Sequence, residues 1–420
     1  NLFSSVEYDS SNGVKDGFAT LKVNNIPIKF DIKKDKANSS LSTLLVAEEV
    51  FSAKQVLHTF DYKNEITGSS KFKILLTLPS YKKGQPFIDS KIEVLSNLEG
   101  ISINFPEPFR KLEDSKIDFN LVFKPYFNKP PLLSFSYGDL FRGKFNFLND
   151  LTEGFVIAGK KKQNISIAKK KILLVGELKK LDLGSFITYG IFNGKGSKNF
   201  FIKDLLVQET NLSNFSLLAT RFSSYNTKEG VVYKFINDEL NGKLLVPEKN
   251  DKSLSFSFDF IKLSQPSSVS KDSFLSLYNS INQEFSLSAD TIILNGHNYG
   301  NWEFSISPGT NQLTIYDIKG TYGRWDLNNN AEGISSLKIS KNTIGWTSNF
   351  EANIYSGSPE KAFMQLGIEP NFELDTLSLD VDLTWNNLPW LFSYNSVSGE
   401  ISANLNGLTI ENNDSLESTK

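Results

Sequence analysis

The chain has 420 residues, a formal net charge of −2 at pH 7 and no cysteine. The near-neutral charge excludes a broad electrostatic attraction to nucleic acid or to anionic membranes. The lack of cysteine excludes disulfides, zinc–cysteine sites and thiol chemistry. No apolar run approaches the roughly 18 residues of a membrane span, and no signal peptide is visible. Because the chain begins at Asn1 rather than at Met, we expect an anchor or export signal to lie outside it.

The first sixty residues predict a hairpin and then a helix. Residues 21–23 and 26–32 alternate apolar and polar side chains around an Asn24-Asn25 turn, which is typical of two antiparallel strands. Residues 46–60 carry apolar side chains at spacings of four and three, which predicts an amphipathic helix that covers the sheet like a plug or lid. The members of this apolar stripe are Val46, Val50, Ala53, Leu57 and Phe60.

Short strands with one apolar face are predicted along most of the remaining chain. The pattern is clearest in residues 377–385 and 397–405, where apolar residues alternate with Ser, Asp, Thr, Glu and Asn on both sides of a turn at 386–389. Short helices are predicted near residues 184–192 and 359–366, and residues 265–283 form a polar loop insertion. A weak repeat of about 80 residues relates 205–217 to 292–304, which is typical of a structure that grows by adding hairpins.

These patterns predict a mainly β fold, a long curled antiparallel sheet that forms a β-groove, with a few short helices. Open twisted sheets seldom exceed about ten strands without curling, so the apolar face should line the inside of a trough. We expect one elongated segment over 1–420, with approximate sub-units 1–110, 111–197, 198–283 and 284–420. The residues predicted to line the groove are Phe72, Ile74, Leu76, Ile117, Phe119, Leu121, Phe123, Leu254, Phe256, Phe258, Leu379, Val381, Leu383, Trp385, Ile401, Ala403 and Leu405.

No residue pattern predicts catalysis, a metal site or a cofactor. The only histidines, His58 and His297, lie apart in the sequence and read as surface residues. Asp380 and Asp382 lie about 7 Å apart on one strand face, but that face is the polar one and reads as solvated. Residues 326–330 imitate the start of a calcium loop, but Ala331 and Leu337 replace the glycine and glutamate that such a loop requires.

Two further patterns leave alternatives open. The lysines at 160–162 and 169–171 flank a small predicted strand and fit either a solvated hairpin at a sheet edge or contact with anionic headgroups, whereas no aromatic platform for nucleic acid accompanies them. The apolar strand faces fit either a lipid-lining groove or the sealed core of a structural β-sandwich or solenoid at the cell surface.

Several stretches, in the same order, resemble the YhdP family of AsmA-like and TamB-like envelope proteins. The resemblance extends from about Gly17 to Gly407 and consists of strand pattern and turn residues. The stretches that carry it are Phe105-Pro106-Glu107-Pro108-Phe109 with Lys111, Leu181 to Phe186, Leu240 to Pro247, Asn298 to Trp302, and Leu379 to Gly407. This chain departs from the family pattern in lacking the N-terminal membrane helix and in being rich in Lys, Asn and Phe.

The resemblance implies a periplasmic protein that is anchored to the inner membrane by a segment not present here. It implies phospholipid transport between the inner and outer membranes of the Gram-negative envelope, and so a part in outer-membrane biogenesis. The implied partners are phospholipid acyl chains and the two membranes, with no nucleic acid and no enzyme chemistry. No catalytic residue carries over from the family.

Overall fold

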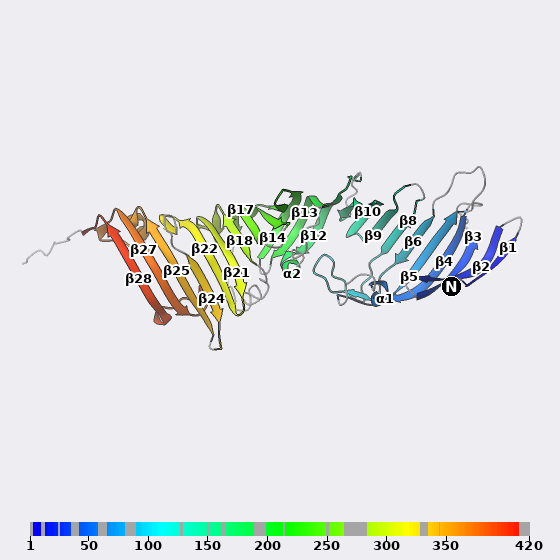
Figure 1. Cartoon of the computed structure of the whole chain (residues 1–420), viewed down its shortest axis with the longest axis horizontal. Coiled ribbons are helices and arrows are strands. Elements are labelled where there is room, and N and C mark those ends of the chain that lie inside the picture. Colours follow the sequence, from blue (N-terminus) through cyan, green and yellow to red (C-terminus); the bar gives the residue numbers. More distant parts are fainter. Residues whose placement is uncertain are drawn as a thin grey trace, which may run out of the picture. The chain divides into compact units, whose positions relative to one another are not determined.

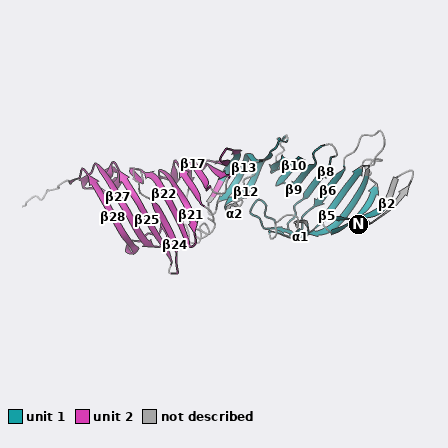
Figure 2. Ribbon diagram, viewed as in Figure 1, with its two compact units in different colours: residues 1–186, 197–211, 218–224 teal, residues 187–196, 212–217, 225–420 magenta. Residues whose placement is uncertain are grey.

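The structure is a computed structural model. It describes residues 3–9, 13–23, 26–34, 42–57, 65–79, 90–126, 129–148, 151–160, 165, 167, 169–188, 199–212, 215–248, 252–263, 284–327, 335–343 and 345–410. The described residues are mainly β, with a few short helices. They form two compact units (Figure 2): unit 1 comprises residues 1–186, 197–211 and 218–224, and unit 2 comprises residues 187–196, 212–217 and 225–420.

The first half of the chain supplies the strands of unit 1 (Figure 1). They are, with two short helices, β1 (Phe3–Asp9), β2 (Gly13–Val23), β3 (Ile26–Lys34), β4 (Ser42–Ser52), α1 (Ala53–Leu57), β5 (Ile66–Pro79), β6 (Lys91–Ser96), β7 (Ile101–Ile103), β8 (Phe119–Lys124), β9 (Leu132–Tyr137), β10 (Phe141–Leu148), β11 (Leu151–Ala158), β12 (Ile172–Asp182), α2 (Leu183–Thr188) and β13 (Phe200–Leu212). The next strand, β14 (Phe215–Asn226), contributes residues to both units.

The second half supplies the strands of unit 2. They are, with α4 and a 3-10 turn, β15 (Gly230–Ile236), β16 (Leu240–Pro247), β17 (Leu254–Leu263), β18 (Phe285–Ala289), β19 (Ile292–Leu294), β20 (His297–Asn298), β21 (Asn301–Gly309), β22 (Gln312–Tyr322), β23 (Trp325–Leu327), β24 (Ser336–Lys341), β25 (Trp346–Ser356), α4 (Pro359–Gln365), β26 (Phe372–Glu373), β27 (Thr376–Asn386), η2 (Tyr394–Ser396), β28 (Val397–Asn406) and β29 (Thr409–Ile410).

Antiparallel neighbours dominate both units, as the alternating pattern predicts. The hairpin predicted at residues 377–405 is confirmed: β27 and β28 pair with Leu379 opposite Ala403 and Val381 opposite Ile401. The hairpin predicted at 21–32 is confirmed by the pairing of β2 with β3. The short helices predicted near 184 and 359 are present as α2 and α4. The predicted insertion at 265–283 lies outside the described residues.

The prediction of an entirely antiparallel sheet is wrong at three places. Strand β11 pairs with β12 in parallel, β12 pairs with β13 in parallel, and β17 pairs with both β18 and β19 in parallel. The connections involved, residues 159–171, 183–199 and 264–284, are long, and parallel strands need a crossover of about a dozen residues or more. The repeated segments at 205–217 and 292–304 each begin in a strand that follows such a crossover.

The helix predicted over 46–60 is wrong for residues 46–52, which belong to β4, and only Ala53–Leu57 is helical. Residues 58–60 lie outside the described residues. The same segment also carries a period of two, because Leu45, Ala47 and Phe51 share one face. Strand β4 pairs with β5 along its whole length and with β3 over part of it, so sheet pairing overrides the helical spacing.

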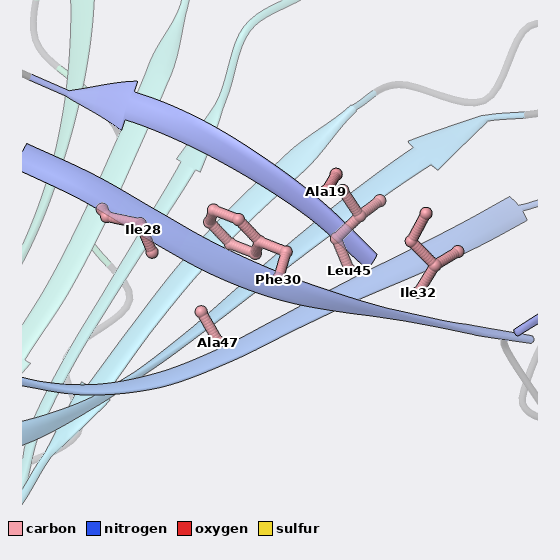
Figure 3. Close-up of a cluster of buried hydrophobic side chains, with 6 residues drawn as sticks. All are labelled: Ala19, Ile28, Phe30, Ile32, Leu45 and Ala47. Carbon is pink, nitrogen blue, oxygen red and sulfur yellow. The ribbon is translucent and has the colours of Figure 1, made fainter. Parts of the chain in front are cut away.

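The core of unit 1 lies on one face of its first strands. Ala19 of β2, the three alternate apolar residues of β3, and Leu45 and Ala47 of β4 are all buried and lie together (Figure 3). Phe51, Ile74 and Leu76 pack against this cluster from β4 and β5. In unit 2 a smaller cluster joins Leu313 of β22, Ile339 of β24 and Leu388. Both clusters lie on the apolar side of their sheets.

Candidate functional site

An apolar face continues from strand to strand through unit 1. The strand registers place apolar or glycine residues directly opposite each other across nine successive strands. This row consists of Ala47, Ile74, Val94, Leu121, Phe135, Gly143, Val156, Leu174 and Ile202. Position 143 requires glycine for close packing with the next strand, because a Cβ there would lie 2.3 Å from the Phe135 ring. We call this side of each unit's sheet the inner face.

Unit 2 has an inner face of the same kind. One row joins β15 to β21 through Tyr233, Leu244, Phe256, Leu287 and Phe304. A second row joins β21 to β28 through Ile306, Ile315, Leu337, Phe350, Leu383 and Gly399. Since the register sets which side chains share a face, one alternating strand after another yields a continuous apolar surface.

The opposite, outer face is polar over β4 and β5 in unit 1 and over β25 and β27 in unit 2, whereas on β11 and β12 it carries the buried apolar residues Ile157 and Val175. In unit 1, Glu48 bridges Lys71 at 2.7 Å and Lys73 at 3.2 Å, and these two lysines lower its pKa. In unit 2, the amide of Asn349 donates to Asp382 at 3.0 Å and that of Asn353 donates to Asp380 at 2.7 Å. The two aspartates are exposed and belong to a row of hydrogen-bonded polar side chains, which confirms the prediction that their face is solvated.

The predicted lining residues lie on the inner face but differ in exposure. Three of them are buried: Phe72, Val381 and Trp385. Ile401 and Leu405, on β28, are 57% and 47% exposed, and Ala403 between them is also exposed. The others are half-buried; Ile117 among them precedes β8 rather than belonging to it. Because these strands are paired on both edges, the half-buried side chains indicate that no second layer of described residues fully covers the middle of this face.

Two segments of unit 2 fold over the ends of its inner face. Leu388, in the turn after β27, is fully buried against Leu313 and Ile339. Across the strands, helix α4 lies against β23, where the indole N–H of Trp325 donates to the carbonyl of Ala362 at 3.1 Å. The inner face of unit 2 is therefore capped at its margins and half-exposed between them.

The other sequence candidates show no assembled chemical site. His297 is exposed in β20, whereas His58, Asn328 and Asn330 lie outside the described residues. Lys160 is exposed and pairs with Asp139 at 2.8 Å, and Lys171 lies over the Phe201 ring at 4.7 Å. Within the ranges that the structure describes, no group of three or more His, Cys, Asp or Glu side chains is placed to hold a metal ion.

Sequence reasoning missed a loop between β7 and β8 that reaches across unit 1. We call residues 103–111 the bridging loop. At its base, Ile103 and Lys111 exchange backbone hydrogen bonds of 2.9 and 3.0 Å. The Lys111 ammonium, 2% exposed, donates to the carbonyls of Ile101 at 2.8 Å and Leu112 at 2.9 Å, and burial lowers its pKa.

The tip of the bridging loop contacts strands that are distant in sequence. The Phe109 ring stacks on Phe141 of β10 at 5.0 Å, and the carbonyl of Glu107 accepts a hydrogen bond of 3.1 Å from the N–H of Asp182 at the end of β12. Nearby, the Tyr137 hydroxyl is buried without a hydrogen-bond partner. Burial, and secondly the charge of Glu107, raises the pKa of Tyr137 to about 12.

The bridging loop also reveals curvature in unit 1. From the line of β6 and β7 to β12 there are five strand-to-strand steps, which in a flat sheet cover about 24 Å. Residues 103 to 107 span at most about 14 Å when fully extended, and one hydrogen bond completes the link to Asp182. The sheet must therefore bend between these strands. The bend is toward the inner face, because Phe109 packs on Phe141 of that face.

One comparison with known proteins gives a match. The family model described as YhdP protein matches residues 4–413, nearly the whole chain. The chain belongs to the YhdP family. YhdP proteins are associated with the cell envelope and with lipid transport, and they are not generally enzymes. Among curated proteins and among solved structures, none matches the chain. No helix within the described ranges has the length and apolar character to cross a bilayer.

Proposed function

We propose that this chain binds phospholipid acyl chains along its inner faces and passes them between the two membranes of the Gram-negative envelope, without covalent chemistry. The observation that carries the proposal is that apolar residues in the middle of the inner face stay partly exposed, such as Leu121 and Phe135 in unit 1 and Phe256 and Leu287 in unit 2. Family membership supports the same conclusion. On this proposal the protein works in the periplasm, and the polar outer faces remain in water.

The energetics of an acyl chain explain why such a face is needed. Burying one CH₂ group is worth about 0.8 kcal/mol, so a 16-carbon chain loses about 13 kcal/mol of favourable burial when it enters water. A path between membranes must therefore offer continuous apolar contact. Rows such as Ile74–Val94–Leu121–Phe135 in unit 1 provide contact of this kind at each strand. Because the contacts are all similar, no single position traps the lipid.

A sealed structural core is the alternative explanation of the same apolar faces. In such a core, side chains at the middle of the face would be buried by a second layer. Leu121 and Leu383 are instead half-buried, and the edge residue Ile401 is mostly exposed. These exposures favour lipid contact over a sealed interior.

Lipid extraction tests the proposal. Protein purified without detergent from a Gram-negative host is extracted with organic solvent, and the extract is analysed by mass spectrometry. We expect co-purified phospholipid in the wild type and much less in Leu121→Asp, with the matched outer-face variant Asn120→Asp as the control. Wild-type protein that folds normally and carries no phospholipid contradicts the proposal.

A further inference from the structure

In unit 1 five short strands, β6 and β8 to β11, lie between the long strands β5 and β12. Strands β5 and β12 contain 14 and 11 residues, whereas β8 and β9 contain six each and β10 and β11 eight each. At about 3.3 Å per residue, β5 is about 46 Å long and β8 about 20 Å long. Measured along its strands, the sheet is therefore narrower at β8 to β11 than at β5 and β12. We call this narrow edge the side wall of unit 1.

The bridging loop occupies the place that the short strands leave. The registers align Phe119, Tyr137, Phe141, Ala158 and Gly176 in one row across β8 to β12. Strand β12 continues for six further residues to Asp182, and β5 continues a similar distance to Ile66, which pairs with Ile103. The loop joins these two extensions through its base at Ile103 and its contact with Asp182.

The loop is firmly held at its base and cannot become a strand at its tip. Lys111 fixes the base through its two side-chain hydrogen bonds and its backbone pairing with Ile103. Pro106 and Pro108 have no N–H group, so the tip cannot pair as a sheet strand. The tip reaches the sheet instead through the Phe109 ring, which is 40% exposed, and through the Glu107 carbonyl.

The surface under the tip is aromatic. Phe109 lies on Phe141, which belongs to the inner face and is only 8% exposed in the closed arrangement. On the neighbouring strand, Tyr137 pairs with Phe141, and its hydroxyl is buried without a hydrogen-bond partner, which costs free energy. An aromatic ring and an alkyl chain make interchangeable apolar contacts with Phe141.

We propose that the bridging loop is a gate in the side wall of unit 1, and that a lipid acyl chain takes the place of the Phe109 ring on Phe141 when the gate opens. This inference rests on the proposed function and adds a point of lateral entry to it. The base at Lys111 is the hinge, and the tip from Phe105 to Arg110 is the moving part.

The absence of native cysteine allows the gate to be locked without side reactions. The backbones of residues 107 and 182 are hydrogen-bonded, which places them within the span of a disulfide. The locked variant is Glu107→Cys/Asp182→Cys after oxidation, and the same protein after reduction is its control. The opposite variant is Phe109→Ala, which removes the ring from Phe141. A photoreactive phenylalanine analogue at position 121 reports lipid contact near the gate, and one at position 383 reports contact in unit 2.

The probe is a vesicle of dioleoyl phosphatidylethanolamine and phosphatidylglycerol. We expect the oxidised lock to lower lipid labelling at position 121 about tenfold and reduction to restore it. We expect Phe109→Ala to raise labelling there about three- to tenfold, the equivalent of one aromatic contact. Labelling at position 383 should change little in either variant.

Three outcomes overturn the gate. Labelling at position 121 that is the same in the oxidised and reduced forms, while position 383 is labelled normally, shows that lipid reaches unit 1 without opening the loop. Labelling at position 121 that falls in Phe109→Ala shows that the ring assists lipid contact instead of competing with it. Absence of labelling at both positions in otherwise wild-type protein refutes the proposed function, and the gate with it.

Discussion

An aspartate placed at two positions of β27 measures how open the inner face of unit 2 is. Leu383 and Leu377 lie on the same strand and the same face, but Leu383 is half-buried whereas Leu377 is 2% exposed. Full burial of a leucine side chain is worth about 1.5–3 kcal/mol. Leu383 is partly exposed, so Leu383→Asp loses less burial than that and leaves a carboxylate that water still reaches; it should lower the free energy of unfolding by only about 1–2 kcal/mol.

Leu377→Asp should cost much more. It removes a fully buried side chain and puts an unpaired carboxylate in its place, which costs several kcal/mol in addition, so the total should exceed about 4 kcal/mol. Urea unfolding followed by tryptophan fluorescence measures both variants. All five tryptophans, at positions 302, 325, 346, 385 and 390, lie in unit 2, so the signal reports that unit alone. Equal losses in the two variants would refute the reasoning, because a sealed core penalises both positions alike.

Three other substitutions have expected outcomes. Lys111→Met should lower the stability of unit 1 by about 1–3 kcal/mol in hydrogen-exchange measurements, because the buried carbonyl of Ile101 and the part-buried carbonyl of Leu112 lose their donor. Since burial lowers the Lys111 pKa, wild-type stability should rise with pH toward 10.5, a gain that the variant lacks. Tyr137→Phe should remove a phenol that titrates at about pH 12 in ultraviolet absorbance. Wild-type stability should fall as pH rises from 10 to 12, because only the unfolded chain loses this proton there, and the variant should lack that fall. Gly399→Ala should destabilise β28 by about 1–3 kcal/mol in urea unfolding, since Gly399 has φ +142° and a Cβ would lie 2.0 Å from the Asp382 carbonyl oxygen; an unchanged midpoint contradicts that strain.

Period-two alternation was sufficient to predict the strands of the β27–β28 hairpin and their faces. The residues of β27 and β28 show why: Leu379, Val381 and Leu383 alternate with Ser, Asp and Thr, and a one-residue slip would turn all of them to the wrong side. The sequence predicts that these three leucine and valine residues share one apolar face, and they share it in the structure. The same pattern could not reveal the parallel pairings, because direction depends on the path of the long connections and not on alternation.

The segment around β4 shows the limit of local pattern. Val46 and Val50 fit a helical stripe, and Leu45, Ala47 and Phe51 fit a strand face, so the two periods coexist in the same residues. Pairing with the preceding strand β3 and the following strand β5 decides between them, and the spacing within residues 46–60 carries no record of those partners. Local spacing favoured the wrong element because the deciding hydrogen bonds are tertiary.

The bridging loop could not be derived from sequence for a related reason. Its contacts join Phe109 to Phe141 and Glu107 to Asp182, over long separations in the chain. Two prolines in a short apolar stretch were the available signal, and they indicate only that the segment is not a strand interior. Lys111 reads as a surface lysine until the structure shows it buried.

Photocrosslinking from neighbouring residues on opposite faces tests the central claim most directly. A photoreactive amino acid is placed at Leu121 or Leu383 on the inner face, and at Asn120 or Asp382 beside them on the outer face. The account predicts phospholipid labelling from the two inner positions and none above background from the two outer ones. Equal labelling from both faces, or labelling from neither in folded protein, would contradict it.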